Sequence, residues 1–130
     1  MTEEQQLARA AGSWGEKVAV EAMERSGAHV IGTNVRVGNL EVDILACQDE
    51  DLIIVEVKTR SDMSADPLLA VNRRKLRRLS RAAVALLEKY SDERGVDYHL
   101  RFDFVLVTGS PEHYTVEHLE DRYQPPCRFY

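Results

Sequence analysis

The sequence predicts an α/β protein with a central mixed sheet of about five strands flanked by helices. Three features of the chain favour this class. The apolar run at 52–55 has the composition of a strand that is buried on both faces. Residues 72–94 carry apolar side chains at helical spacing. Strand-like segments lie on both sides of this helix, so the predicted order is helix, three strands, helix and two strands.

The amino-terminal segment is predicted to be helical in two parts. Residues 3–11 form the first part, which Gly12 interrupts. The stretch Ser13-Trp14-Gly15-Glu16 has the pattern of a capping box, with Ser13 as the N-cap and Glu16 at the third helical position. Gly27 is placed to end the second part.

Three strands are predicted to follow this helix. The first covers 29–37 and ends at the turn Gly38-Asn39, the second covers 40–46, and the third covers 52–60. The acidic segment 47–51 is predicted to be the turn between the second and third strands.

The second half of the chain is predicted to contain one helix and two strands. Residues 61–71 are predicted to form a loop, and Asn72 is placed to cap a helix that runs to about Arg94. Strands are predicted at 101–108 and 114–118, followed by a short turn and tail at 119–130. No linker composition divides the sequence, so residues 1–130 are predicted to form a single domain.

Length and composition indicate an ordinary globular protein. The 130 residues are 44% hydrophobic and 30% charged, and no stretch reaches the ~18 apolar residues of a membrane span. The polar, acidic amino terminus does not have the pattern of a signal peptide. Cys47 and Cys127 belong to no CxxC pair and are interpreted as reduced thiols, so we expect a cytoplasmic protein without a membrane partner. His113 and His118 lack zinc-binding spacing and are expected at the surface.

Two acidic clusters lie thirteen residues apart, and the second ends in a lysine. The first is Glu41-Val42-Asp43 and the second is Glu56-Val57-Lys58. If the second and third strands form a hairpin around a four-residue loop at 48–51, four residue pairs should face each other. From the turn outward these pairs are Cys47 with Leu52, Leu45 with Ile54, Asp43 with Glu56, and Glu41 with Lys58.

Opposed carboxylates repel each other unless a cation lies between them. Asp43 and Glu56 would have their Cβ atoms ~5 Å apart on one face of the sheet. Mg²⁺ suits this arrangement, because it favours one or two carboxylates together with water and phosphate oxygens. Strand alternation places Lys58 and Arg60 on the same face as Glu56, where the apolar part of the strand ends. Open α/β sheets usually hold ligands at such strand ends.

Each cluster alone has a structural explanation. An acid two positions from a lysine, or from another acid, is common on a solvated strand face. Glu16 alone is explained by the capping box. The combination of opposed Asp43 and Glu56, the adjacent Lys58 and the apolar strand around them favours a magnesium-dependent site that cleaves phosphodiesters.

A strongly basic segment lies on the predicted second helix. The net charge of −5 argues weakly against a nucleic-acid partner, yet six positive charges fall within nine residues with no acid among them. They are Arg73, Arg74, Lys75, Arg77, Arg78 and Arg81. The sequence places no acid four positions after any of these arginines, so they suit phosphate groups; a merely solvated helix face is the alternative.

These motifs give the chain a family resemblance. It resembles the YraN-like family of small uncharacterised bacterial proteins, which look like relatives of archaeal Holliday junction resolvases in the PD-(D/E)xK nuclease superfamily. The resemblance covers nearly the whole chain. It depends on Gly15-Glu16, Asn34-Val35-Arg36, Glu41-Val42-Asp43, the stretch Val55-Glu56-Val57-Lys58-Thr59-Arg60, Lys75, and Arg101-Phe102-Asp103.

The resemblance implies a restriction-endonuclease-like core and a Mg²⁺-dependent endonuclease that hydrolyses DNA, including branched or Holliday-junction substrates. The catalytic residues that it implies are Glu16, Asp43, Glu56 and Lys58, with Asp43 and Glu56 as ligands of Mg²⁺ or, alternatively, Mn²⁺. Glu16 is expected to approach from a helix packed on the face that carries Glu56. The expected DNA contacts are Arg36, Arg60, Arg73, Arg74, Lys75, Arg77, Arg78 and Arg81. A homodimer is suggested by analogy with resolvases alone.

Two other functions stay open at this point. The chain could be a nucleic-acid-binding module that keeps the fold without cleaving, or a protein-interaction component in which the carboxylates are structural. The resembled family usually has glycine immediately before the acid-x-acid motif, where this chain has Leu40, and this departure favours a binding module. Magnesium binding separates the nuclease from both alternatives, and salt-dependent DNA binding separates the two alternatives from each other.

Overall fold

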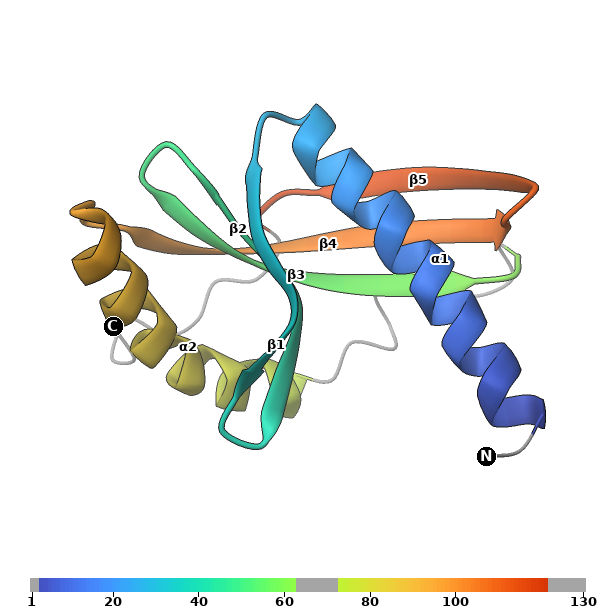
Figure 1. Ribbon diagram of the computed structural model, residues 1–130, viewed down its shortest axis with the longest axis horizontal. Helices are drawn as coiled ribbons and strands as arrows, with labels where there is room; N and C mark the ends of the chain where they lie inside the picture. The colour runs from blue at the N-terminus through green and yellow to red at the C-terminus, as the bar shows by residue number, and fades with distance from the viewer. Residues whose placement is uncertain (1–2, 63–72, 122–130) are drawn as a thin grey trace.

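Five strands form one sheet in the order β1-β2-β3-β4-β5, and one helix packs on each of its faces (Figure 1). A computed structural model describes residues 3–62 and 73–121, with side chains described for 13–62, 74 and 76–121. The elements are α1 (Glu3–Arg25), β1 (His29–Val37), β2 (Leu40–Gln48), β3 (Asp51–Arg60), α2 (Arg73–Arg94), β4 (His99–Ser110) and β5 (His113–Leu119). The predicted α/β class and order of elements are confirmed.

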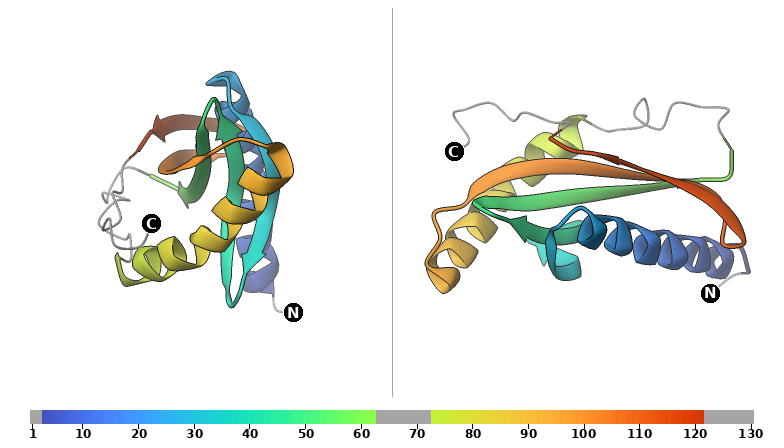
Figure 2. Two further views of the ribbon diagram at one scale, coloured as in Figure 1. Left: turned by 90° about the vertical axis from the view of Figure 1, so that its left-hand side faces the viewer. Right: turned by 90° about the horizontal axis from the view of Figure 1, so that it is seen from above.

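The sheet is mixed, as predicted, because one of its neighbouring strand pairs is parallel. β3 and β4 run in the same direction, whereas the other neighbours are antiparallel. A parallel pair needs a long crossover connection, and the segment between β3 and β4 contains α2. This connection returns the chain from the end of β3 to the start of β4, as the two views of Figure 2 show.

Helix α1 is continuous from Glu3 to Arg25, so the predicted break at Gly12 and the capping box at Ser13 are wrong. A glycine inside a helix costs only ~1 kcal/mol relative to alanine, and helix extension is cooperative. Packing of the helix against the sheet can therefore carry it through this position. As a result Glu16 lies within the helix and is not needed to cap it.

The turn between β2 and β3 is shorter than predicted. Gln48 pairs with Asp51, which leaves Asp49 and Glu50 as a two-residue turn in place of four residues. Asp49 has a φ of 53°, a left-handed conformation that aspartate tolerates better than most side chains. β4 and β5 also extend beyond their predicted ends, because backbone pairing does not require apolar side chains. The predicted loop and tail fall mainly at 63–72 and 122–130, outside the described residues.

Two hydrophobic cores lie on opposite faces of β3. Ile53 and Val55 pack in the core that contains residues of α1, whereas Leu52 and Ile54 pack in the core that contains residues of α2. The predicted alternation along this strand is therefore confirmed. By the same alternation Glu56 belongs to the α2 face, at the point where the apolar side chains of that face end.

Candidate functional site

The first member of the candidate site, Asp43, lies where the β2–β3 ladder ends. Within the described strands the ladder stops at Ile44 and Val55. One residue further on, the carboxylate of Asp43 accepts a hydrogen bond from the backbone N–H of Val57 at 2.8 Å. A side chain thus takes the place of the backbone acceptor that a continued ladder would provide.

This geometry tests the predicted hairpin register. The two predicted pairs nearest the turn are confirmed, namely Cys47 with Leu52 and Leu45 with Ile54. The ladder does not continue to the two outer pairs, Asp43 with Glu56 and Glu41 with Lys58, within the described strands. The Asp43 carboxylate is nevertheless fixed at the amide of the residue directly after Glu56, so the two acids still come from adjoining positions of neighbouring strands.

Glu56 and Lys58 form an ion pair at the carboxyl-terminal end of β3. Lys58 Nζ lies 3.3 Å from Glu56 Oε1, and the Glu56 side chain is 11% exposed whereas that of Lys58 is 31% exposed. A carboxylate buried to this degree needs a cationic or hydrogen-bonding partner, because burial without one is costly. Lys58 provides that partner and keeps its own charge near solvent.

A kink in β1 lies beside Asp43. Asn34 has a φ of 52°, and the strand pairs on its two sides belong to different faces of the sheet. Thr33 pairs with Ile44 of the α1-side core, whereas Val35 pairs with Val42 of the α2-side core. The outer part of the β1–β2 hairpin therefore turns toward α2, and the sheet bends where Asp43 leaves the ladder.

Glu16 approaches this kink from the other face of the sheet. Its Oε2 accepts a hydrogen bond from Asn34 Nδ2 at 3.2 Å. Because α1 packs on the face opposite Glu56, the expectation that Glu16 and Glu56 share a face is wrong. Strand alternation fixed the face of Glu56, but no local pattern in the sequence indicated on which face α1 would pack.

Gly15 allows α1 to approach β3 closely at the level of the site. A Cβ atom at this position would collide with Thr59 Oγ1, so only glycine fits without movement of the threonine. Thr59 stands between Lys58 and Arg60 on β3. The glycine before Glu16 thus has a packing role, which the sequence alone did not reveal.

Helix α2 brings part of the basic segment to the same end of the sheet. In the sheet register Glu56 pairs with Phe104 and Lys58 pairs with Leu106. Both of these β4 residues share a small core with Leu76 in the first turn of α2. Arg77, at the next position of the helix, is exposed. Its charge therefore lies close to the level of Glu56 and Lys58 in the sheet.

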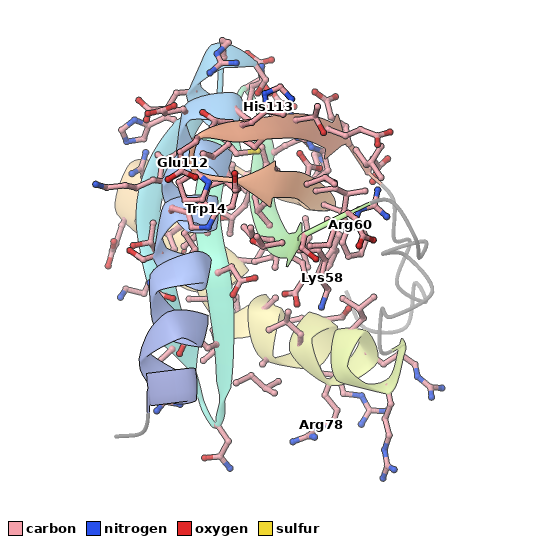
Figure 3. The ribbon with its side chains drawn as sticks, turned by 90° about the vertical axis from the view of Figure 1, so that its right-hand side faces the viewer. Trp14, Lys58, Arg60, Arg78, Glu112 and His113 are labelled. Atoms are coloured by element: carbon pink, nitrogen blue, oxygen red, sulfur yellow. The ribbon has the colours of Figure 1, made fainter. Side chains whose placement is uncertain are left out.

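The other predicted DNA-contacting residues occupy several places. Four of the α2 arginines that were predicted to contact DNA have exposed side chains, and Figure 3 shows Arg78 directed away from the sheet. They are Arg74, Arg77, Arg78 and Arg81. Arg73 and Lys75 lie in the helix, but their side chains are outside the described part. Arg60 Nε donates to Thr108 Oγ1 at 2.9 Å, and the exposed Arg36 stands opposite Glu41 in the outer hairpin.

Comparison with known proteins places the chain among bacterial relatives. The family model described as "Uncharacterised protein family UPF0102" matches residues 15–107. The chain belongs to the uncharacterised protein family UPF0102. A UPF0102 protein of Bacteroides thetaiotaomicron is 35% identical over 127 residues, which cover 97% of this chain and 98% of the relative. A UPF0102 protein of Geobacter metallireducens is 36% identical over 114 residues, covering 87% and 91% of the two chains.

The matched part of this UPF0102 chain contains every residue of the candidate site. A third relative, from Bacteroides fragilis, is 38% identical over 116 residues, covering 88% of this chain and 93% of its own. The family range begins at Gly15, which packs on Thr59, and ends at Val107, which lies in the α1-side core. The match therefore spans α1 from its contact with β3, all of α2, and most of β4.

The donors at the UPF0102 site are of the kind that Mg²⁺ prefers. Asp43 and Glu56 provide carboxylate oxygens, and the backbone carbonyl of Val57 belongs to the residue whose amide already binds Asp43. Across the described residues, no three side chains of His, Cys, Asp or Glu gather as a metal site. Two carboxylates are enough for Mg²⁺, which usually completes its coordination with water and substrate phosphate. The residues present therefore fit a magnesium ion held jointly with substrate.

A second polar cluster lies on the α1 face and surrounds Asp103, whose side chain is completely buried. Arg101 donates to both carboxylate oxygens, at 3.0 and 2.9 Å, and the backbone N–H of Asp121 donates at 3.0 Å. His118 Nε2 lies 2.7 Å from Asp103 Oδ2, so the expectation that His118 is a surface residue is wrong. The spacing of these residues in the sequence gave no signal of the contact, because β5 brings His118 from fifteen positions away.

Burial and hydrogen bonding act in opposite directions on the pKa of Asp103. Burial raises it most strongly, but the hydrogen bonds from His118, Arg101 and the Asp121 amide together lower it below the usual value of 3.8. Asp103 is therefore held as an anion, which indicates a structural role in joining β4 to β5.

Among the described helices, none is long and apolar enough to cross a membrane.

Proposed function

We propose that this UPF0102 protein is a Mg²⁺-dependent endonuclease that hydrolyses phosphodiester bonds of DNA. The observation that carries the proposal is the placement of the Asp43 carboxylate on the amide of Val57, between Glu56 and Lys58 in the chain. Two acids and one lysine thus come from adjoining positions of β2 and β3, where the β2–β3 ladder ends. The arginines of α2 begin at the same end of the sheet.

The residues of the site support distinct roles. Asp43 and Glu56 would hold Mg²⁺, with the Val57 carbonyl as a third ligand. When bound, the ion would lower the pKa of a water molecule that it holds and would offset the negative charge of the phosphate. Lys58 would orient the attacking water and stabilise the negative charge that develops on the phosphate. Its pairing with Glu56 at 3.3 Å supports this position, because the ammonium group is held beside the acid.

Glu16 has a supporting role in this proposal. Its hydrogen bond to Asn34 holds the β1 kink against α1, beside the strand that carries Asp43. Glu16 would therefore position the hairpin that supplies Asp43. This assignment differs from a direct catalytic role, since α1 lies on the face opposite Glu56.

The arginines of α2 support a polyanionic substrate. Exposed arginines on the turns after Leu76 place positive charge at the level of Glu56 and Lys58, although the whole chain has a net charge of −5. Such a local excess attracts phosphate groups to one surface of an acidic protein. Arginine is suited to this task because its planar guanidinium group can bind phosphate through two donors.

A cleavage assay tests the proposal. The full chain would be incubated with labelled single-stranded, duplex, flap and four-way-junction DNA in Mg²⁺, Mn²⁺ or EDTA. We expect metal-dependent cleavage that falls by more than about 100-fold in Glu56→Gln, which keeps the size of the side chain and removes its charge. The matched control is Glu117→Gln on the exposed face of β5.

Binding measurements decide between the proposal and its alternatives. Metal-independent, salt-sensitive DNA binding without cleavage in any metal would replace the nuclease with a nucleic-acid-binding module. Absence of both cleavage and binding would leave a protein-interaction component. Magnesium binding has its own readout, since Mg²⁺ should raise the Tm of the wild type and not that of Asp43→Asn.

A further inference from the structure

An aromatic pair lies at the same end of the molecule as the proposed cleavage site. The ring centroids of Trp14 and Tyr114 are 5.4 Å apart, with the ring planes inclined by 53°. Tyr114 is 40% exposed, and it is the one large hydrophobic residue classed as exposed among the described side chains. Trp14 is half-buried, with part of its ring against the α1-side core. The pair thus combines a ring that is held by the core, Trp14, with a ring that is accessible to solvent, Tyr114.

The position of the pair is set by the packing of α1 against β3. Trp14 directly precedes Gly15, which packs on Thr59 between Lys58 and Arg60. In Figure 3 the end of the sheet that faces the viewer carries Trp14 on the side of α1, and Lys58 and Arg60 on the other side. The aromatic surface and the proposed catalytic lysine therefore belong to one end of the fold, although they come from opposite faces of the sheet.

The sheet register gives the separation between the two features. Lys58 pairs with Leu106 of β4, and Tyr114 pairs with Gly109 three residues further along that strand. With ~3.3 Å per residue along a strand and ~4.8 Å between strands, the Cα atoms of Lys58 and Tyr114 are about 14 Å apart. At the ~3.4 Å rise of a stacked strand, that distance sets a lower limit of about four nucleotides, because the two side chains stand on opposite faces of the sheet.

The charges around the pair are of both signs. Lys17 is exposed one helical turn after Trp14, and residues at this spacing lie on the same side of a helix. Arg60, two residues after Lys58 on β3, donates a hydrogen bond to Thr108 Oγ1 at 2.9 Å. Glu112, two residues before Tyr114 at the tip of the β4–β5 hairpin, is the opposing charge.

We infer that Trp14 and Tyr114 form a stacking surface for an unpaired base of the DNA strand that enters the proposed site. The inference rests on the proposed function and names its substrate class as DNA with unpaired nucleotides next to the cleaved bond. Aromatic faces bind any base by stacking, but only when that base is not enclosed in a duplex. Fully paired DNA can offer its phosphates to α2, yet it has no base available for this pair.

The single tryptophan of the chain makes the test direct. Trp14 is the only tryptophan in the sequence, so all indole fluorescence reports on this position. Oligothymidylate would be added to the full chain in EDTA at low salt, where cleavage does not interfere. We expect saturable quenching of Trp14, and much weaker quenching by a blunt duplex of the same length at the same phosphate concentration.

Two variants separate stacking from a packing role of Tyr114. Tyr114→Phe keeps the aromatic face and should bind like the wild type, whereas Tyr114→Leu keeps apolar bulk without that face. We expect Tyr114→Leu to bind oligothymidylate about ten-fold more weakly, with duplex binding and Tm unchanged. Glu112→Gln should strengthen the binding of both kinds of DNA, since it removes a negative charge beside the strand.

The outcomes distinguish this inference from the proposed function. Equal quenching by oligothymidylate and duplex, or equal affinity of Tyr114→Leu and Tyr114→Phe, would overturn the stacking surface even if the protein cleaves DNA. Selective quenching that disappears in Tyr114→Leu would support it even if no metal gives cleavage.

Discussion

The carboxylate of Asp43 accepts the backbone N–H of Val57 at 2.8 Å, directly beyond the last pair of the β2–β3 ladder. This bond joins stability to the proposed chemistry, because the same side chain ends the hairpin and supplies a carboxylate beside Glu56. A charged acceptor that binds a backbone amide contributes more than a neutral one. The two contributions can be separated by substitutions that keep or remove the acceptor.

Asp43→Ala should lower the free energy of unfolding by about 1–3 kcal/mol, because it leaves the Val57 amide without its acceptor. Asp43→Asn keeps an oxygen in that place and should lose clearly less stability. Both variants should lose Mg²⁺-dependent cleavage, since neither provides the charge. Urea unfolding and the cleavage assay measure the two effects. Equal midpoints for the two variants would show that the hydrogen bond does not support the fold.

Gly15→Ala should destabilise the protein, although alanine is normally better in a helix by ~1 kcal/mol. The added methyl group collides with Thr59 Oγ1, and overpacking of this kind typically costs about 1–3 kcal/mol. The measurement is a double-mutant cycle in thermal or urea unfolding. Thr59→Ala removes the colliding atom, so the double variant should recover most of the loss. Additive losses would mean that the close approach of α1 to β3 is not what requires glycine.

Asp103→Asn should lower the free energy of unfolding at neutral pH by about 3–5 kcal/mol, because it leaves Arg101 without its buried anion. Stability should also depend on pH in a defined direction. Because the pKa of Asp103 in the folded protein lies below 3.8, its contribution is complete above that pH and is lost as the pH falls through the folded-state pKa.

Unfolding curves between neutral pH and acid measure this dependence. The wild type should lose stability more steeply than Asp103→Asn below about pH 4. Glu117→Gln, at an exposed position of the same hairpin, serves as the matched control and should behave like the wild type. Parallel acid limbs for the wild type and Asp103→Asn would contradict the assigned role of the buried carboxylate.

Salt dependence should report the arginines of α2. If about five phosphate contacts form, the slope of log affinity against log salt should be on the order of −4 to −5. Removing one contact by Arg77→Ala or Arg78→Ala should make the slope less steep by ~0.9. Lys89→Ala removes an exposed charge from a distant turn of the same helix and should leave the slope unchanged. Binding of duplex DNA at several salt concentrations gives the slopes, and an identical change in all three variants would indicate only the effect of net charge.

Local residue patterns were enough to predict several of the helices and strands. The apolar run of β3 and the leucine spacing of α2 identified both elements, and alternation along β3 assigned Glu56 and Lys58 to one face. The pattern on β2 and β3 also gave the register nearest their turn correctly, because a slip of one residue would expose the buried side chains. These features depend on neighbours that are close in the chain.

The way in which those elements pack on one another could not be predicted from local patterns. Residues that are distant in the sequence determine the face on which α1 packs. They also make the contact of Gly15 with Thr59 and the hydrogen bond of Asp43. The same holds for Asp103 and His118, which the pairing of β4 with β5 brings together. Local periodicity carries no information about such contacts, because they depend on packing free energy summed over whole helices and strands. The acids of the candidate site could therefore be predicted from the sequence, whereas their arrangement was set by the packing of the sheet and its two helices.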